Sequence, residues 1–438
     1  MRLALLHLAA LAAAACAAEP FPERGTVSAA LEPPPRPREC RTVRAGEALQ
    51  PFLDSAPEGS ALCLAPGRHQ GPITIARRVS LFGPREAVIR TSGAGTTVLV
   101  TADGARVAGI TIDGSGGRYD TQDAAIAVRD AQGVQVEGLR VVNAVFGILA
   151  ENTTDTLIRG NEVIGDPETL RGMRGDGIRL WETRRSRIEH NLVQHSRDLV
   201  VWYSPANTFV GNRVEHSRYG THFMYSHDNV VEEGVFRSNA VNIFIMYSRN
   251  VRVRGADLID AHGPSGMGIG LKDSGDVEIT ESRFVHNAMG VYLDTSPLSL
   301  EDENRFANNL FTLSDRAIVF HGRGDRNVFT DNAFASNREQ IVVEGRGDAL
   351  GATFATNRFD DYAGYDLDDD GIGDIPYEVR SLSNQLTGTY PVLAFFAGTP
   401  ALAIVEVVGR IVPLFAPRTI AVDPRPRMVG GGPTGEER

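Results

Sequence analysis

Histidine and methionine side chains that could bind a soft metal ion are concentrated in the middle of the chain. The stretch HFMYSHDN at residues 222–229 contains His222 and Met224, and the related stretch IFIMYSRN at 243–250 contains Met246. Thioether sulfur and imidazole nitrogen favour a soft ion, above all Cu(I). The two methionines are 22 residues apart (246 − 224), so whether they share an ion depends on how the chain repeats in space.

Two further candidate ligands lie in an insertion after this stretch. The segment AHGPSGMG at 261–268 carries His262 and Met267, and it lengthens the local interval from 22 to 26 residues (269 − 243). A protein-docking patch is the alternative interpretation, because methionine and tryptophan side chains also suit protein contacts. The copper hypothesis names His222, Met224 and Met246 as ligands, with Met267 and His262 completing the site.

The candidate ligands belong to an internal repeat. Tyr203, Tyr225 and Tyr247 follow one another at intervals of 22 residues (225 − 203 and 247 − 225), and matching turns carry Asn161, Asn191 and Asn212. Each unit has two short apolar segments and cannot bury its apolar face alone, which is typical of one coil of a parallel β-helix. A β-propeller, whose blades need about 40 residues, and a leucine-rich repeat are the alternative architectures. The sequence predicts an all-β, right-handed parallel β-helix with coils of about 22 residues.

Alternation along each strand predicts which side chains face outward. Aliphatic pairs such as Ile243 and Ile245 recur in every unit and must point into the core. The residues between them point outward, and the repeat stacks them coil upon coil, about 4.8 Å apart. One outer row is Trp181, Trp202, Met224 and Met246. A second row beside it is Val200, His222 and Phe244.

Apolar side chains repeated on one outer face are typical of a binding surface. We expect Trp202 to shield the thioethers or to contact a partner, together with Trp181 and Phe244. The alternative is that a loop or the C-terminal segment covers this face, which would make the rows ordinary core.

An acidic loop near the end of the repeats resembles a calcium-binding loop. The segment YDLDDDGIGDIPY at 365–377 follows the first nine positions of the EF-hand pattern, D-x-D-x-D-G-x-x-D. The twelfth position, which normally supplies a bidentate carboxylate, is Tyr377. Calcium binding and an acidic turn that caps the last coil both remain open. The calcium hypothesis names Asp366, Asp368, Asp370 and Asp374 as ligands.

The N-terminus predicts export from the cytoplasm. Residues 1–18 combine Arg2 with an apolar run and small residues, as in a secretory signal peptide, and residues 19–39 form a linker rich in proline and charge. Lipidation of Cys16 is an alternative that the missing upstream leucine disfavours. Removal of the signal leaves Cys40 and Cys63, which in an oxidising compartment most simply form a structural disulfide.

The end of the chain changes character after the predicted β-helix, which spans 40–390. Residues 391–418 are apolar, with Glu406 and Arg410 at a helix-supporting spacing, and their charges and prolines argue against a membrane span. We predict a helical docking segment there and a disordered tail at 419–438. The residues expected to contact a partner are Phe395, Phe396, Leu402, Val405 and Leu414.

Composition and motifs exclude several functions. The net charge of −11 argues against nucleic-acid binding. Many parallel β-helices cleave polysaccharides with paired carboxylates, but the predicted outer rows lack such a pair, and Asp294 with Asp273 is an isolated possibility. A phosphate-binding loop, a nucleophile elbow and an HExxH motif are also missing from the sequence. We therefore expect a binding protein rather than an enzyme, with a secreted polysaccharide-active protein as the least favoured alternative.

A string of motifs resembles the NosD family. The motifs are GDGIRLW, VWYS, RYGTHFMYSHDN, IFIMYSRNV, GPSGMGIGLKDS, GVYLDTSP, NREQ and DDYAGYDLDDDGIGDIPY, and with the apolar tail they cover about residues 40–415. The repeat alone is generic, whereas this string of motifs is specific.

The resemblance implies a periplasmic accessory protein without hydrolase activity that helps to assemble the copper centre of nitrous oxide reductase. It implies three partners: a membrane ABC transporter made of an ATPase and a membrane subunit, a copper chaperone lipoprotein, and the reductase itself. It places the chain at the inner membrane, docked on the transporter through its C-terminal segment. The resemblance supports copper but not the particular ligands named above. A docking scaffold that binds no metal is the main alternative.

Overall fold

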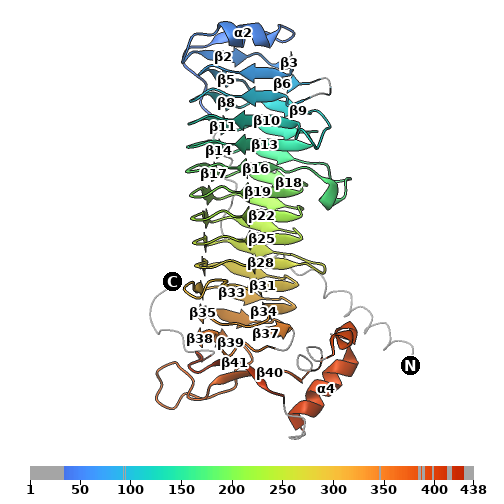
Figure 1. Cartoon of the computed structure of the whole chain (residues 1–438), viewed down its shortest axis with the longest axis vertical. Helices are drawn as coiled ribbons and strands as arrows, with labels where there is room; N and C mark the ends of the chain where they lie inside the picture. Colours follow the sequence, from blue (N-terminus) through green and yellow to red (C-terminus); the bar gives the residue numbers. More distant parts are fainter. Residues whose placement is uncertain are drawn as a thin grey trace, which may run out of the picture.

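In the computed structural model, the chain winds into coils whose strands form three long parallel β-sheets around a common core (Figure 1). The structure describes residues 34–91, 93, 95–344, 347–382, 386, 390–396, 399–411 and 417–428. Each full coil contributes one strand to each sheet, and each strand pairs in parallel with the strand one coil away. The predicted fold class, a parallel β-helix, is confirmed.

Sheets A and B carry the shorter strands. Sheet A contains β1 (Arg41–Val43), β2 (Ala61–Leu64), β5 (Ser80–Phe82), β8 (Arg106–Ala108), β11 (Gln135–Glu137), β14 (Leu157–Arg159), β17 (Arg187–Glu189), β20 (Thr208–Val210), β23 (Val230–Glu232), β26 (Arg252–Arg254), β29 (Glu278–Thr280), β32 (Asn304–Ala307), β35 (Asn327–Thr330) and β38 (Thr353–Ala355). Sheet B contains β3 (Gly67–Gln70), β6 (Ala87–Arg90), β9 (Thr111–Asp113), β12 (Arg140–Val142), β15 (Glu162–Ile164), β18 (Leu192–Gln194), β21 (Arg213–Glu215), β24 (Val235–Arg237), β27 (Asp257–Ile259), β30 (Arg283–Val285), β33 (Leu310–Thr312), β36 (Ala333–Ala335) and β39 (Arg358–Phe359).

Sheet C carries the longer strands and all of the predicted copper ligands except His262. It contains β4 (Ile73–Ile75), β7 (Val98–Val100), β10 (Ala124–Arg129), β13 (Phe146–Glu151), β16 (Ile178–Trp181), β19 (Asp198–Trp202), β22 (Tyr219–Met224), β25 (Val241–Met246), β28 (Met267–Lys272), β31 (Met289–Asp294), β34 (Arg316–His321) and β37 (Glu339–Glu344). The aliphatic side chains predicted to face inward, such as Ile243 and Ile245, are buried in one continuous core. Their alternation with outward side chains follows from the two-residue period of a strand.

Stacked identical side chains hold successive coils in register. Asn191 Oδ1 accepts hydrogen bonds from the backbone N–H of Asn161 at 3.0 Å and from its side-chain amide at 2.9 Å. The Asn191 amide donates in turn to Asn212 Oδ1 at 2.9 Å and to the carbonyl of Ile158 at 2.9 Å. Because all three asparagines are buried, each amide satisfies backbone groups that water cannot reach.

Phenylalanine replaces the aliphatic side chains in the last coils. The rings of Phe284, Phe311, Phe334 and Phe359 stack at centroid distances of 4.5, 4.9 and 4.9 Å. These distances match the spacing between coils of about 4.8 Å, so one ring per coil forms a continuous column.

The N-terminal end of the β-helix is covered by a short helix that sequence patterning did not predict. Helix α2 (Leu49–Ser55) buries Leu49 and Leu53 against the first coil. Cys40 and Cys63 form a disulfide with Cα atoms 5.6 Å apart, which links the segment before β1 to β2. The signal peptide and Cys16 lie outside the described residues.

The C-terminal segment returns to the last coils. The 3₁₀ helix η2 (Pro391–Phe396) and helix α4 (Pro400–Ile411) follow the repeats, and strand β41 (Thr419–Asp423) pairs antiparallel with β40 (Tyr377–Arg380). No helix within the described residues is long and apolar enough to cross a membrane.

The structure differs from the predicted disordered tail at residues 419–428, which are described and ordered into β41 and a following bridge. Asp423 gives the physical reason. Its Oδ2 accepts hydrogen bonds from the backbone N–H and the side-chain amide of Asn357, at 3.1 and 2.9 Å. Asn309, Asn332 and Asn357 form a second asparagine stack. The carboxylate accepts from its last member, whose buried donors would otherwise be unpaired.

The asparagine stack makes a testable prediction for stability. Asn191→Ala leaves the donors of Asn161 and the carbonyl of Ile158 without partners in a buried site. We expect a loss of about 1–3 kcal/mol for each group left unpaired, measured as a lower urea midpoint. Gln135→Ala, at an exposed position of β11, is the control and is expected to change stability by less than about 0.5 kcal/mol. Equal midpoints for the two variants would contradict this role.

Candidate metal site

The outer face of sheet C carries the two predicted rows of side chains. Backbone pairing places Trp181 beside Trp202, Trp202 beside Met224, and Met224 beside Met246. In the second row, Val200, His222 and Phe244 are neighbours. The sequence interval of 22 residues is thus converted into direct contact between successive coils.

Aromatic rings surround the His222 imidazole, which is only 5% exposed. The Trp202 indole meets the imidazole edge-to-face at a centroid distance of 5.4 Å. The Tyr219 ring does the same at 4.9 Å, and the Phe244 ring stacks on the other side at 6.1 Å. The imidazole is therefore largely shielded from water by side chains of its own coil and of the two neighbouring coils.

The two ring nitrogens of His222 face different groups. Nε2 lies 3.3 Å from the sulfur of Met246. Nδ1 accepts a hydrogen bond from Trp202 Nε1 at 3.3 Å and lies 3.7 Å from Asp198 Oδ2. A lone pair on Nδ1 suits the indole N–H, whereas a hydrogen on Nδ1 suits the carboxylate and leaves the lone pair on Nε2 for a metal ion. The neighbours of Nδ1 can thus support either tautomer.

Asp198 is a buried carboxylate that sequence reasoning did not identify. It forms a two-point ion pair with Arg218, in which Nε donates to Oδ1 at 2.9 Å and the terminal nitrogen donates to Oδ2. Burial acts to raise the pKa of Asp198, but the neighbouring His222 and Arg218 side chains outweigh it and lower the pKa. The same ion pair raises the pKa of Arg218, against the opposing effect of burial. Asp198 therefore stays ionised behind His222.

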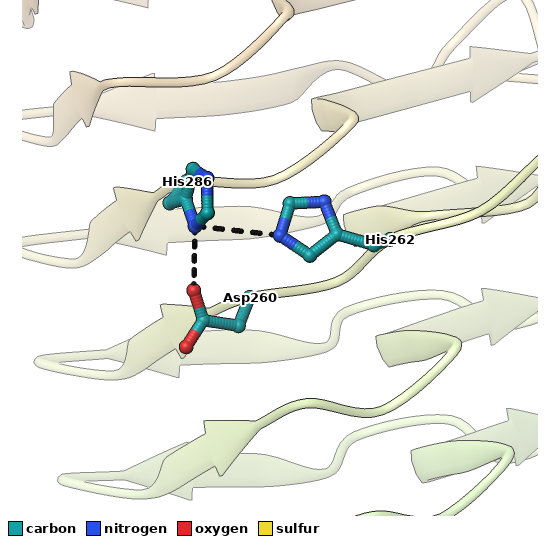
Figure 2. Close-up of side chains that lie close together, drawn as sticks. All are labelled: Asp260, His262 and His286. Carbon is teal, nitrogen blue, oxygen red and sulfur yellow. Dashed lines mark hydrogen bonds and ion pairs between the residues drawn. The ribbon is translucent and has the colours of Figure 1, made fainter. Parts of the chain in front are cut away.

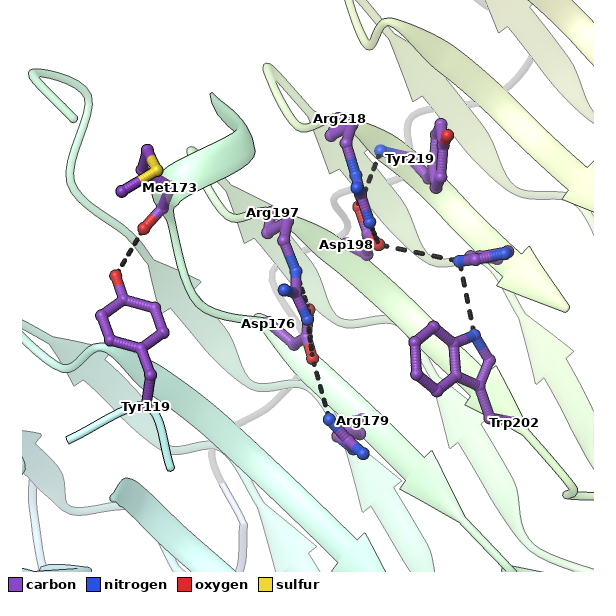
Figure 3. A network of polar contacts seen from close by, with 10 residues as sticks. Tyr119, Met173, Asp176, Arg179, Arg197, Asp198, Trp202, Arg218 and Tyr219 are labelled. Atoms are coloured by element: carbon purple, nitrogen blue, oxygen red, sulfur yellow. Dashed lines mark hydrogen bonds and ion pairs between the residues drawn. The ribbon is translucent and has the colours of Figure 1, made fainter. Parts of the chain in front are cut away.

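A second buried pair lies one coil earlier (Figure 3). Arg197 donates two hydrogen bonds to Asp176, at 2.8 and 2.9 Å. Burial still raises the pKa of Asp176. The Arg179 guanidinium contacts Asp176 at 3.5 Å and covers the ring of Trp202 at 5.4 Å. The Arg179 guanidinium therefore packs against Trp202, whose indole N–H donates to His222.

Met246 and Met224 supply the sulfur atoms of the candidate site. Both occupy the last position of their strands, and their Cα atoms are partners in adjacent coils. Both side chains are partly exposed, so an ion could reach them from solution. Imidazole with one or two thioethers is a donor set that suits Cu(I).

The structure does not bring the other two proposed ligands to this site. The sulfur of Met267 lies over Gly270, beside the Phe244 ring, and its side chain packs with Met289 and Val319 in a separate apolar cluster. Phe244 lies on β25, in the coil between that of His222 and that of Met267. Its ring stacks against His222 and so separates the two side chains. His262 contacts His286 and Asp260 instead. The five-residue ligand set therefore divides, and only His222, Met224 and Met246 share one face as neighbours.

The predicted partner-binding residues also divide. Trp181, Trp202 and Phe244 are partly exposed on sheet C. In the C-terminal segment, Phe395 and Phe396 are exposed, whereas Leu402 is only 9% exposed and Val405 is intermediate. Helical periodicity places positions 402, 405 and 409 on one face of α4. This is the less exposed side of the helix. Leu414 lies outside the described residues.

The acidic loop contains three of its four predicted ligands in one group. Carboxylate oxygens of Asp366, Asp368 and Asp370 lie within 4.8 Å of one another, whereas Asp374 Oδ2 accepts the backbone N–H of Leu367 at 2.7 Å. Repulsion from Asp370 raises the pKa of Asp368. Tyr377, at the twelfth position, donates its hydroxyl to Asp361 at 2.9 Å and cannot replace the missing carboxylate.

Calcium binding to this loop is directly testable. If Ca²⁺ relieves the repulsion among these carboxylates, it should raise the Tm of the C-terminal end. An ion at a hundredfold excess over its Kd stabilises by about 2.7 kcal/mol. Differential scanning calorimetry with Ca²⁺ and with chelator measures the effect. Asp368→Asn should abolish it, while Asp348→Asn, an exposed control outside the loop, should not. A Tm that does not respond to Ca²⁺ would favour the acidic-turn interpretation.

Comparison with known proteins identifies relatives of the chain. The family model described as "Periplasmic copper-binding protein (NosD)" matches residues 164–362, which include both rows and the 261–268 insertion. A protein of Stutzerimonas stutzeri named "Probable ABC transporter binding protein NosD" is 27% identical over 80% of this chain and 83% of its own length. A protein of Pseudomonas aeruginosa with the same name is 28% identical over 80% of this chain and 84% of its own length. The resemblance to the NosD family is confirmed.

The catalytic domain of a polysaccharide-degrading enzyme shares the fold. The catalytic domain of a GH87 alpha-1,3-glucanase in complex with tetrasaccharides superposes with a TM-score of 0.56 and 14% identity, covering 74% of this chain and 69% of the glucanase domain. At this level of identity the likeness concerns the parallel β-helix alone. It carries no statement about substrate.

Proposed function

We propose that the chain is a periplasmic copper-handling protein that binds Cu(I) between His222 and Met246, with Met224 as a third ligand. The observation that carries the proposal is the distance of 3.3 Å between His222 Nε2 and the Met246 sulfur. Two donor atoms this close, one of them on the partly exposed Met246 side chain, can bind one ion after a small outward movement. Imidazole and thioether together select Cu(I) over harder cations.

The groups behind His222 complete a carboxylate–histidine–metal arrangement. Metal-binding imidazoles usually donate their second ring N–H to a carboxylate or carbonyl, which orients the ring and raises its basicity. Asp198 is positioned for this role at 3.7 Å from Nδ1. In this structure, the Trp202 indole N–H donates to Nδ1 instead. Binding of Cu(I) at Nε2 therefore requires Nδ1 to carry the hydrogen and to turn toward Asp198.

The aromatic enclosure supports the reduced ion. Trp202, Tyr219 and Phe244 surround the imidazole, and a water-poor, apolar shell lowers the dielectric around a site and limits solvent access. Cu(I) carries less charge than Cu(II) and loses less hydration in such a place. The same shell leaves the Met224 and Met246 edge partly exposed, so that copper can enter and leave.

The assembly role is the finer part of the proposal. The copper bound here would be delivered for the copper centre of nitrous oxide reductase, after transfer from a copper chaperone lipoprotein and in association with a membrane ABC transporter. The family description supports copper, and the names of the two relatives support the transporter. The transfer steps and the inner-membrane association rest on the resemblance alone.

Binding, rather than catalysis, is what we propose for the outer face. Asp294, one of the carboxylates in the outward row of sheet C, accepts a hydrogen bond from Lys272 at 2.7 Å. Burial acts to raise the pKa of Asp294, but Lys272 outweighs it and lowers the pKa. A carboxylate held ionised by a lysine is poorly suited to act as the general acid of a glycosidase.

Cu(I) titration tests the site. The purified mature chain is titrated anaerobically against a competing chelator, beside Met246→Leu and His222→Gln. Met246→Leu keeps the side-chain volume and removes the sulfur, so we expect at least about a tenfold loss of affinity, the loss typical even of residues that only support a ligand. Met289→Leu and His227→Gln are the matched controls and should bind as the wild type does.

Two outcomes would contradict the assignment. Equal affinity in Met246→Leu and Met289→Leu would move the ion away from this face. No binding by the wild-type chain would favour the metal-free docking scaffold. Circular dichroism of each variant separates lost ligands from lost folding.

The docking scaffold is a second candidate because α4 exposes an apolar face. Ile404 and Ile411 are 64% and 72% exposed, and Val407 and Val408 lie on the same side. An apolar helix face that is exposed within the described part of the chain suits the membrane subunit of a transporter better than water.

Substitution of this face should separate docking from copper binding. Ile404→Asp/Ile411→Asp should abolish co-purification with the detergent-solubilised ABC transporter while leaving Cu(I) affinity unchanged, because charge on the face opposes burial. Leu170→Asp, at an exposed leucine outside this segment, is the control. Co-purification of the double variant at wild-type yield would place the transporter contact elsewhere.

A further inference from the structure

A second group of metal-binding side chains lies at the corner between sheets B and C. The residue that follows each sheet B strand in this region adopts a left-handed backbone conformation, with φ between 54° and 56° for His195, His216, Ser238, Asp260 and His286. Because every coil turns in the same way, these residues form a column along the corner. Asp260 and His286 are neighbours in that column and come from successive coils, after β27 and β30.

The 261–268 insertion adds the third member of the group. It folds back through a turn in which Gly266 N–H donates to the Gly263 carbonyl at 2.9 Å. Gly263 has a φ of 95°, and a Cβ at Gly266 would lie 2.6 Å from the Ala261 carbonyl oxygen. Both positions therefore require glycine. The turn directs His262 back over the corner column.

The three side chains converge on one point (Figure 2). His286 Nδ1 lies 2.8 Å from Asp260 Oδ1 and 3.3 Å from His262 Nε2. A tetrahedral ion with ligand bonds of about 2.0–2.1 Å has neighbouring ligand atoms about 3.3 Å apart. The observed distances therefore need only a small opening between Asp260 and His286 to admit an ion.

We propose that Asp260, His262 and His286 form a binding site for a borderline divalent transition-metal ion, with Zn²⁺ as its probe. Two imidazoles and one carboxylate are the donor set of open three-ligand zinc sites, and imidazole suits zinc, copper(II) and nickel alike. Both histidines are exposed and Asp260 is partly exposed, so a fourth position stays available to water or to a group from a partner. The donor set differs from that of His222 and Met246, which lacks a carboxylate ligand and contains thioethers.

The same corner contains a natural comparison without the carboxylate. His195 and His216 stack face to face, with ring centroids 5.0 Å apart and planes 8° from parallel. Parallel rings at this distance direct their nitrogen lone pairs side by side rather than toward a shared ion. His262 and His286 instead meet edge-to-face, at 4.5 Å and 73°. The insertion and Asp260 therefore distinguish the proposed site from an ordinary histidine stack.

Zinc titration tests the proposal independently of copper. The full mature chain is titrated with Zn²⁺ against a chromophoric chelator, beside His262→Gln/His286→Gln, Asp260→Asn and the control His195→Gln/His216→Gln. We expect one tightly bound zinc ion in the wild type and its loss in the first variant. Asp260→Asn should weaken binding by at least about tenfold, and the control should bind normally.

The outcomes are decisive in both directions. The proposal is overturned if the wild type binds no zinc, if the His262/His286 variant binds it equally, or if the stacked-pair control loses it to the same extent. Met246→Leu should keep zinc binding, and loss of zinc in that variant would show that the two sites are one. Circular dichroism of each variant shows whether it is folded. His262 and His286 are exposed, so their substitution is expected to leave the core intact.

Discussion

Parallel hydrogen bonding between successive coils is the interaction on which every other feature of this molecule depends. It converts an interval of 22 residues in the sequence into a separation of about 4.8 Å in space, and so brings Met246 to His222. A slip of one residue would turn each outward side chain into the core. Both candidate metal sites exist only because several consecutive coils keep the same register.

Stacked side chains hold that register, but the stack at each end of the β-helix has no further coil to pack against. Each asparagine hydrogen-bonds to the asparagine of the next coil, and each phenylalanine ring packs on the next ring. The last member of each column therefore needs a different partner. At one end α2 covers the apolar core. At the other, the Asp423 carboxylate receives the hydrogen bonds that a further asparagine would have accepted. A repeat protein needs such caps because each coil buries its apolar face only against its neighbours.

The two candidate sites use the same scaffold in opposite ways. His222 is buried among aromatic rings, with an ionised carboxylate behind it and thioethers at the partly open edge. His262 and His286 lie on an exposed corner, with a carboxylate as a direct neighbour. Burial and sulfur favour a soft, singly charged ion, whereas exposure and oxygen favour a divalent one. One chain can therefore separate two kinds of metal ion by the position of each site on the coil.

Local periodicity in the sequence determined the parallel β-helix, the inward aliphatic stacks and the two outer rows, because a two-residue strand period and a constant coil length leave one arrangement that buries the apolar side chains. It also placed His222, Met224 and Met246 on one face. Tertiary structure alone decided the rest. Asp198 is the first residue of its strand, and its carboxylate lies 3.7 Å from His222 Nδ1. The sequence interval between the two residues does not predict this contact. The insertion interrupts the repeat, so the period could not predict that His262 turns toward His286 and away from Met246. Asp423 caps a stack 66 residues away in sequence, a contact that depends on where the whole chain returns and not on any local pattern.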